Sequence, residues 1–301
     1  MNLEKGGEGA DRIEIDPVTG HPTTGHVWDG IRELNRPLPR WWLWTFYATI
    51  IFSLAYVVLY PAIPLLSGGT GGVLDYSARE TVEGDIALAR QAQAGRLGEI
   101  ATLPLEEIKA SPDLNRFAIA GGRSAFLVNC IQCHGTGAAG SPGYANLNDD
   151  DWLWGGSLED IYHTIAYGIR SDHADTRFSE MPAFGGMLTR PEIVAVANYV
   201  LSLSGEPHDE ALAAQGADIY NKPTNCAACH GANGEGSRKD GAPRLNDAIV
   251  LKAGTLGEIV AQIANPKHGV MPAWTGRLND TVVKELALYV HSLGGGEAAA
   301  P

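Results

Sequence analysis

The chain has 301 residues, of which 45% are hydrophobic and 19% are charged, so it is long enough for more than one globular domain. Its formal net charge of −13 argues against nucleic acid as a partner and favours a basic partner instead. The 37 glycines indicate domains that are rich in loops.

Residues 1–38 form a polar N-terminal segment with turn signals at Asp16-Pro17, Gly20 and Pro37. The segment 39–66 follows, and its part 41–60 is an almost continuous apolar run without charge. About twenty residues at 1.5 Å per residue match the roughly 30 Å hydrocarbon core of a bilayer, so the pattern predicts one transmembrane helix. Aromatic residues suit the two membrane interfaces and prolines end the span: Trp41, Trp42, Trp44, Tyr56, Tyr60, Pro61 and Pro64.

A cleavable signal peptide is the alternative interpretation of this segment. The apolar run begins about forty residues into the chain and is too long for a signal peptide, which favours the transmembrane helix. The next basic residue after the span is Arg79, so the positive-inside rule predicts a cytoplasmic N-terminus. We therefore expect a single-pass protein of a bacterial inner membrane, with the later domains in the periplasm. The basic residues before the span are Lys5, Arg12, Arg32, Arg36 and Arg40.

The segment 67–110 is expected to link the membrane helix to the domains that follow. Residues 68–72 are rich in glycine and predict a flexible tether just outside the membrane. Residues 77–110 are mostly helix formers and predict two helical pieces that are interrupted at Pro104. These pieces pack on a partner or on the first domain, and a solvated spacer is the alternative.

Two Cys-x-x-Cys-His motifs have the attachment pattern of c-type haem: Cys130-x-x-Cys133-His134 and Cys226-x-x-Cys229-His230. Two thiols one helical turn apart can add to the two vinyl groups of one porphyrin, and the adjacent histidine can bind its iron. A thioredoxin-like redox pair and half of a zinc site are the alternatives. Because the pattern occurs twice and uses all four cysteines, it favours two covalently attached haem c groups.

The two motifs belong to a sequence repeat of about ninety residues, which predicts two domains at 111–205 and 206–301. Each motif is followed by a glycine-rich loop that ends in Leu-Asn, and then by a helix with apolar residues at helical spacing. A Met-Pro pair and a terminal helix, at 191–203 or 281–293, complete each repeat. The expected fold class is all-α, with one N-terminal transmembrane helix before two tandem cytochrome c-type haem domains.

Met181 and Met271 occupy matching positions, and each precedes a proline that stiffens its loop. A thioether is the sixth ligand that suits an electron-transfer haem, whereas the alternative for such residues is adaptable core packing. His173 and His268 are the rival ligands and would lower the haem potential. The spacing leaves open whether each proximal histidine pairs with the methionine of its own repeat. The expected axial ligands are His134, Met181, His230 and Met271.

Proximal histidines need an acceptor for their second ring nitrogen. The backbone carbonyl of Pro243 is well placed for this role, and Ala145 holds the equivalent position in the first repeat. Four further residues are candidates for packing on haem or contacting its propionates, with ordinary packing as the alternative: Trp152, Trp154, Arg177 and Trp274.

Three stretches of the chain carry a family resemblance: residues 26–44, residues 147–156 and residues 181–185. In these stretches the sequence resembles the dihaem subunit III of cbb3-type cytochrome c oxidases, the CcoP or FixP family. The first stretch belongs to no generic cytochrome c. The main departure is Ala145, where the family pattern leads us to expect proline.

The resemblance implies an electron-input subunit of a proton-pumping terminal oxidase. Electrons would come from a soluble or anchored cytochrome c and cross the two haems of this chain. They would then pass through a monohaem subunit to the catalytic haem–copper subunit, which reduces O₂ to water. This chain supplies no oxygen site itself, so its expected work is electron relay.

Two other functions fit the motifs without the resemblance. One is an anchored dihaem carrier that serves periplasmic reductases. The other is a dihaem enzyme such as a peroxidase, in which one haem must open a coordination site. The two matching Met-Pro pairs argue against the peroxidase.

Overall fold

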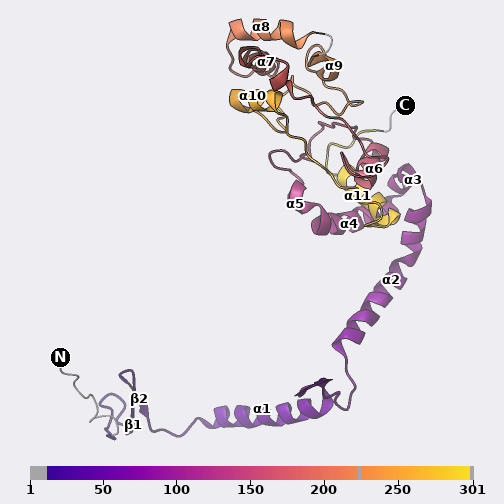
Figure 1. Cartoon of the computed structure of the whole chain (residues 1–301). Helices are drawn as coiled ribbons and strands as arrows, with labels where there is room; N and C mark the ends of the chain where they lie inside the picture. The colour runs from indigo at the N-terminus through magenta and orange to yellow at the C-terminus, as the bar shows by residue number, and fades with distance from the viewer. Residues whose placement is uncertain (1–11, 223–224, 299–301) are drawn as a thin grey trace, which may run out of the picture. The chain divides into compact units, whose positions relative to one another are not determined.

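The computed structural model describes residues 12–222 and 225–298 and divides the chain into two compact units, residues 1–89 and 90–301 (Figure 1). Residues 1–11, which include the predicted cytoplasmic Lys5, lie outside the described residues. The described chain is mostly helical, which confirms the predicted fold class.

The first unit begins with a β-hairpin of strands β1 (Thr23–Trp28) and β2 (Ile31–Leu34). Its two-residue turn consists of Asp29 and Gly30, both with positive φ (49° and 85°), as a type I′ turn requires. The sequence had predicted only a polar segment with turns here. The short strands are therefore an addition to the all-α prediction.

Helix α1 (Arg40–Leu59) forms the predicted membrane span. It has 20 residues and is, in the described part of the chain, the helix long and apolar enough to cross a membrane. None of its side chains is buried, and its apolar residues lie on all sides, as a lipid-facing helix requires.

The glycine-rich segment after α1 is hydrogen-bonded rather than a free tether. Strands β3 (Pro64–Leu65) and β4 (Gly68–Gly69) pair with each other. Val73 N–H and Leu74 N–H then donate to the carbonyls of Val58 and Leu59, at 2.9 Å and 3.1 Å. These bonds satisfy carbonyls that the end of a helix leaves without partners. The prediction of a flexible tether was therefore wrong.

Helices α2 (Ala78–Thr102) and α3 (Leu105–Ala110) are the two predicted helical pieces, and they are separated at Pro104 as expected. Ile100, Leu105 and Ile108 are buried in a core that includes residues of the first repeat, so the C-terminal part of this segment packs on a domain. Most of α2 is exposed.

The remaining helices follow the predicted repeat. The first repeat contains α4 (Pro112–Asn129), α5 (Ile131–His134), α6 (Leu158–Tyr167), the 3-10 helix η1 (Phe184–Gly186) and α7 (Arg190–Leu203). The second contains α8 (Glu210–Tyr220), α9 (Ala227–His230), α10 (Leu256–Ala264) and α11 (Asp280–His291).

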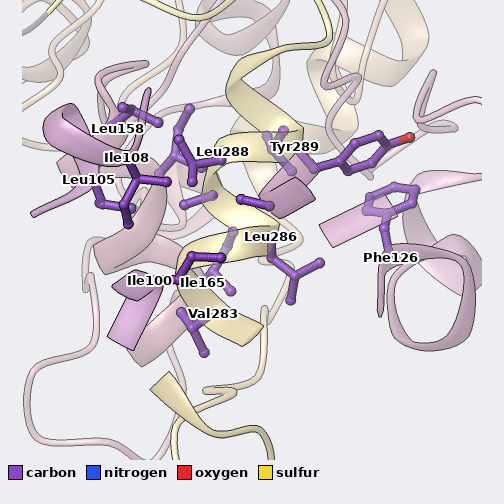
Figure 2. Packing of buried hydrophobic residues seen from close by; sticks show 14 of the residues in the cluster. Ile100, Leu105, Ile108, Phe126, Leu158, Ile165, Val283, Leu286, Leu288 and Tyr289 are labelled. Atoms are coloured by element: carbon purple, nitrogen blue, oxygen red, sulfur yellow. The ribbon is translucent and has the colours of Figure 1, made fainter. Parts of the chain in front are cut away.

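The two hydrophobic cores draw on both repeats. In the first core, α4 and α6 of the first repeat pack against α11 of the second (Figure 1). Figure 2 shows α11 between side chains that come from α2, α3, α4 and α6. The labelled members of this first core are Ile100, Leu105, Ile108, Phe126, Leu158, Ile165, Val283, Leu286, Leu288 and Tyr289.

In the second core, α8 and α10 of the second repeat pack against α7 and η1 of the first. Its buried members include Phe184, Ile193, Val196, Leu201, Tyr220, Ile259 and Ile263. The repeats have thus exchanged their C-terminal helices. The predicted limits 111–205 and 206–301 describe the sequence repeat, and the packed cores cross them.

A glycine allows each close helix crossing. A Cβ on Gly122 of α4 would lie 2.0 Å from the Glu285 carbonyl oxygen of α11. A Cβ on Gly216 of α8 would lie 2.1 Å from the Ala195 carbonyl oxygen of α7. An aromatic pair stands beside each crossing, Phe126 with Tyr289 and Tyr220 with Tyr199, at centroid distances of 5.3 Å and 5.0 Å.

Candidate haem sites

Each Cys-x-x-Cys-His motif forms one tight helical turn. His134 N–H donates to the Cys130 carbonyl at 3.0 Å, and His230 N–H donates to the Cys226 carbonyl at 2.9 Å. All four cysteines are free. Each motif therefore offers two thiols and an imidazole from one turn.

The thiol acidities do not favour a reactive redox pair. Burial raises the pKa of Cys130 to about 11 and that of Cys226 to about 11. Thioredoxin-like cysteines act through a thiolate whose pKa is lowered instead. In addition, the described residues contain no group of three or more His, Cys, Asp or Glu side chains that could hold a metal ion without a cofactor.

Both proximal histidines are fixed by backbone carbonyls. His134 Nδ1–H donates to the Ala145 carbonyl and His230 Nδ1–H donates to the Pro243 carbonyl, each at 2.9 Å. The predicted role of Pro243 is confirmed, and Ala145 performs it equally because only its carbonyl is used. Each Nε2 is thus left unprotonated and able to bind iron. Burial also lowers the pKa of His230, which favours the neutral imidazole.

The second motif opens into a cavity of about 270 Å³. Cys226, Cys229 and His230 line it, and so does Met181, which comes from the first repeat. Most of the remaining wall is apolar, including Phe184, Val196, Val200, Leu201, Ile259 and Ile263. The structure therefore brings Met181 together with His230.

Met271 lies with the first motif. It packs against the first core, as do Cys130 and Ile131. Its backbone pairs with Ile169 in an antiparallel bridge, in which Ile169 N–H donates to Met271 O at 2.9 Å and Met271 N–H donates to Ile169 O at 3.0 Å. The exchange of helices thus places Met181 in the cavity of the second motif and Met271 on the core that also contains Cys130.

The rival histidines occupy different surroundings. His173 packs against the ring of Tyr167, and its Nδ1 accepts a hydrogen bond from Asp175 N–H at 3.1 Å. His268 lines the second cavity but is exposed, whereas Met181 is partly buried against the second core. Met187 is 62% exposed and does not line the second cavity.

Orphaned polar atoms test whether the first site fits haem. Thr164 Oγ1 and Arg177 Nε are buried without a hydrogen-bond partner in the described structure. By the repeat, Thr164 matches Gln262, which lines the second cavity. A haem carries two propionates that can accept from such donors. The cysteines and histidine of both motifs, the orphaned atoms and the apolar wall of the second cavity fit the group.

The tryptophan candidates are held by protein contacts. Trp152 Nε1–H donates to the Gly295 carbonyl at 2.6 Å, and Trp274 packs against the first core. Trp154 lies under the guanidinium of Arg177, 5.6 Å from the ring centroid, and Arg177 Nη2 donates to Asp160 at 2.8 Å. Ordinary packing explains the three tryptophans.

Three cationic residues of the second cavity were missed by sequence reasoning, namely Arg170, Arg244 and Lys252. The repeat gave no signal for Arg170, because it lies in a stretch between α6 and Met181 that is longer than the corresponding stretch before Met271. Lys252 follows the Leu-Asn loop of the second repeat, at the position that Trp154 holds in the first.

Comparison with known proteins supports one family along the chain. Residues 20–67 match the N-terminal domain of cytochrome oxidase-cbb3, FixP. Residues 117–200 and 211–290 each match the family described as cytochrome c oxidase, cbb3-type, subunit III. The two latter matches coincide with the two sequence repeats.

Similar curated proteins cover almost the full length. The cbb3-type cytochrome c oxidase subunit FixP of Sinorhizobium medicae is 55% identical over 284 residues, which is 94% of this chain and 98% of that protein. The FixP subunit of Rhizobium meliloti is 54% identical with the same coverage. The cbb3-type subunit CcoP of Cereibacter sphaeroides is 49% identical over 92% of this chain and 96% of that protein.

Proposed function

Because the chain belongs to the FixP or CcoP family, the cytochrome c-containing subunit of cbb3-type cytochrome c oxidases, we propose that it relays electrons through two covalently bound haem c groups. As a member of this family, the chain is a subunit of an oxidoreductase complex that contains other subunits. The observation that carries the relay is the common cavity of Cys226, Cys229, His230 and Met181. It combines two attachment thiols with two ligands that suit an electron-transfer haem.

The proposed ligation crosses between the repeats. His134 and Met271 hold the first haem, which is attached to Cys130 and Cys133. His230 and Met181 hold the second, which is attached to Cys226 and Cys229. The support is the exchange of C-terminal helices, which packs Met271 on the first core and lines the second cavity with Met181.

The residues of the chain perform distinct tasks at each site. Each cysteine S–H adds across one vinyl C=C, so that sulfur bonds to carbon, the proton goes to the neighbouring carbon and no electron is lost. The histidine Nδ1–H is held by a carbonyl, which fixes the ring and directs Nε2 to the metal. Methionine supplies a neutral sulfur, and the apolar walls exclude water. When bound, haem supplies the one-electron couple.

The donor and acceptor follow from the oxidase assignment. The donor is a soluble or anchored cytochrome c, and the net charge of −13 favours a basic one. Electrons leave through a monohaem subunit toward the catalytic haem–copper subunit, which reduces O₂ to water as protons are pumped.

The proposed topology has one membrane crossing in a bacterial inner membrane. The described basic residues Arg12, Arg32, Arg36 and Arg40 precede or begin α1, so the N-terminus lies in the cytoplasm. Both haem domains then lie in the periplasm. Helix α1 contacts lipid and the catalytic subunit.

Purification in mild detergent through a tag on this chain tests the function. The oxidase assignment predicts that haem b and copper co-purify with haem c, and that reduced cytochrome c supports O₂ uptake. Haem c alone, without uptake, would instead support an anchored carrier. A peroxide-dependent turnover with one five-coordinate haem would support the peroxidase.

A further inference from the structure

One guanidinium connects the loops that carry the two proposed methionine ligands. Arg170 Nε–H donates to the Gly269 carbonyl at 2.7 Å, and Arg170 Nη1–H donates to the Ser179 carbonyl at 2.8 Å. Gly269 lies two residues before Met271, and Ser179 lies two residues before Met181. The same side chain is therefore bonded at equivalent points of both loops.

The backbone around Arg170 is held from several sides. Its neighbour Ile169 makes both hydrogen bonds of the bridge to Met271, and Arg170 N–H donates to the Arg177 carbonyl at 2.8 Å. Arg170 itself has a φ of 52°, in the left-handed region that residues other than glycine rarely adopt. A conformation of this kind persists where the surroundings determine it, and it is concentrated at functional sites.

Close contact at Gly168 also fixes the Met271 loop. A Cβ at this position would lie 2.3 Å from the Met271 carbonyl oxygen, so only glycine lets the two strands approach. Segment 168–170 thus holds the Met271 loop through its backbone and the Met181 loop through the Arg170 side chain.

The charge of Arg170 faces the second haem cavity. Arg170 and Lys252 both line the cavity, and so does Glu180, whose negative charge acts on Arg170. Burial lowers the pKa of Lys252, and the nearby positive charge of Arg170 lowers it further. A guanidinium has five N–H donors, so donors remain for an anionic group such as a propionate.

We propose that Arg170 is a positioning residue that holds both methionine loops and places a positive charge at the second haem, so that one side chain sets the properties of both sites. The inference rests on the proposed function, because it concerns residues around the two haems. A nearby positive charge stabilises the reduced haem, which carries one positive charge fewer than the oxidised haem. The two hydrogen bonds keep each thioether within reach of its metal.

Redox titration of the full chain with both haems attached tests this proposal. Arg170→Gln removes the charge and one of the two bonds. We expect the ratio of reduced to oxidised haem at the second site to fall about tenfold at a fixed solution potential, which is about 59 mV for one electron. The far-red absorption band of methionine-ligated ferric haem should weaken at both sites.

Arg170→Lys separates the charge from the two bonds. Lysine retains the charge, so the ratio of reduced to oxidised haem at the second site should return to within about threefold of its value in the unaltered protein. A single ammonium lacks the planar fork that reaches both carbonyls, so the far-red band should stay weakened at both sites. Arg190→Gln is the control, because Arg190 is exposed at the start of α7, and it should leave both ratios and the band unchanged.

Three outcomes would overturn the proposal. They are unchanged potentials and an unchanged band in Arg170→Gln, a weakening of the band at only one of the two sites, and full recovery of the band in Arg170→Lys. If Arg170→Gln loses a covalent haem, the band of Arg170→Lys decides the question by itself. A failure of methionine ligation itself is distinguishable, because Met181→Leu and Met271→Leu would then leave the band intact in a protein that retains Arg170.

Discussion

Gly122→Ala tests the packing of α4 against α11, on which the proposed first haem site depends. The new Cβ would lie 2.0 Å from the Glu285 carbonyl oxygen, whereas ordinary contact begins at 3.4 Å, so the helices have to separate by about 1.4 Å. Overpacking of this kind costs about 3 kcal/mol, and the better helix propensity of alanine returns about 1 kcal/mol. We expect a net loss of about 2 kcal/mol, or roughly thirtyfold in the unfolding equilibrium.

The same substitution should affect one site more than the other. The loop of Met271 leads into α11, so the far-red band of the first haem should weaken while that of the second is retained. Urea unfolding followed by helical circular dichroism gives the stability, and redox titration gives the sites. Gly98→Ala is the matched control, because Gly98 is exposed in α2 with nothing within 4 Å of a new Cβ. It should stabilise the protein by about 1 kcal/mol. A Gly122→Ala protein of unaltered stability, or one perturbed only at the second haem, would refute the crossing of α4 and α11.

Three further changes follow from the described contacts. Burial raises the pKa of Glu285 to about 7 from an ordinary value of 4.5, so its contribution to stability is present below about pH 4.5 and is lost as the pH rises through about 7. The free energy of unfolding should fall by about 3 kcal/mol over this range, as measured by thermal unfolding between about pH 4 and about pH 8. The fall should disappear in Glu285→Gln. Lys284 Nζ donates to the carbonyls of Ile100, Ala101 and Leu103 at 3.1–3.2 Å, so Lys284→Met should lower the free energy of unfolding by about 2 kcal/mol, and equal stability would contradict the role. Cys226→Ser with Cys229→Ser should remove one of two covalent haems, and two haems remaining after denaturing electrophoresis would contradict the attachment sites.

Local sequence patterns were sufficient for the parts of the fold that depend on neighbouring residues. The apolar run predicted α1, and the 3.6-residue spacing of Leu158, Ile161 and Ile165 predicted α6. The role of the Pro243 carbonyl was also predictable, because a proximal histidine needs an acceptor. In each case the interacting residues lie close together in the sequence.

The exchange of helices was beyond such patterns. Gly122 and Gly216 provide the same close crossing, and Tyr289 and Tyr199 provide the same aromatic contact, so either N-terminal helix has a suitable surface for either C-terminal helix. The choice depends on contacts between segments far apart in the chain. Residues that match across a repeat carry no information about that choice.

The tether and Arg170 were missed for different reasons. The glycine-rich residues 68–72 suggested a flexible segment, but the absence of a side chain at Gly72 also lets the backbone reach the last carbonyls of α1. Arg170 donates to the backbone carbonyls of Ser179 and Gly269. Because every residue type has such a carbonyl, no sequence pattern predicts these contacts.

A redox titration of methionine variants, in a protein that retains only the first haem, tests the crossed ligation most directly. In the Cys226→Ser, Cys229→Ser background, Met271→Leu should lower the potential of the remaining haem and remove its far-red band. Met181→Leu and the exposed-site control Met187→Leu should leave both unchanged. If Met181→Leu removes the band and Met271→Leu preserves it, each haem takes its methionine from its own repeat and the crossed ligation is wrong.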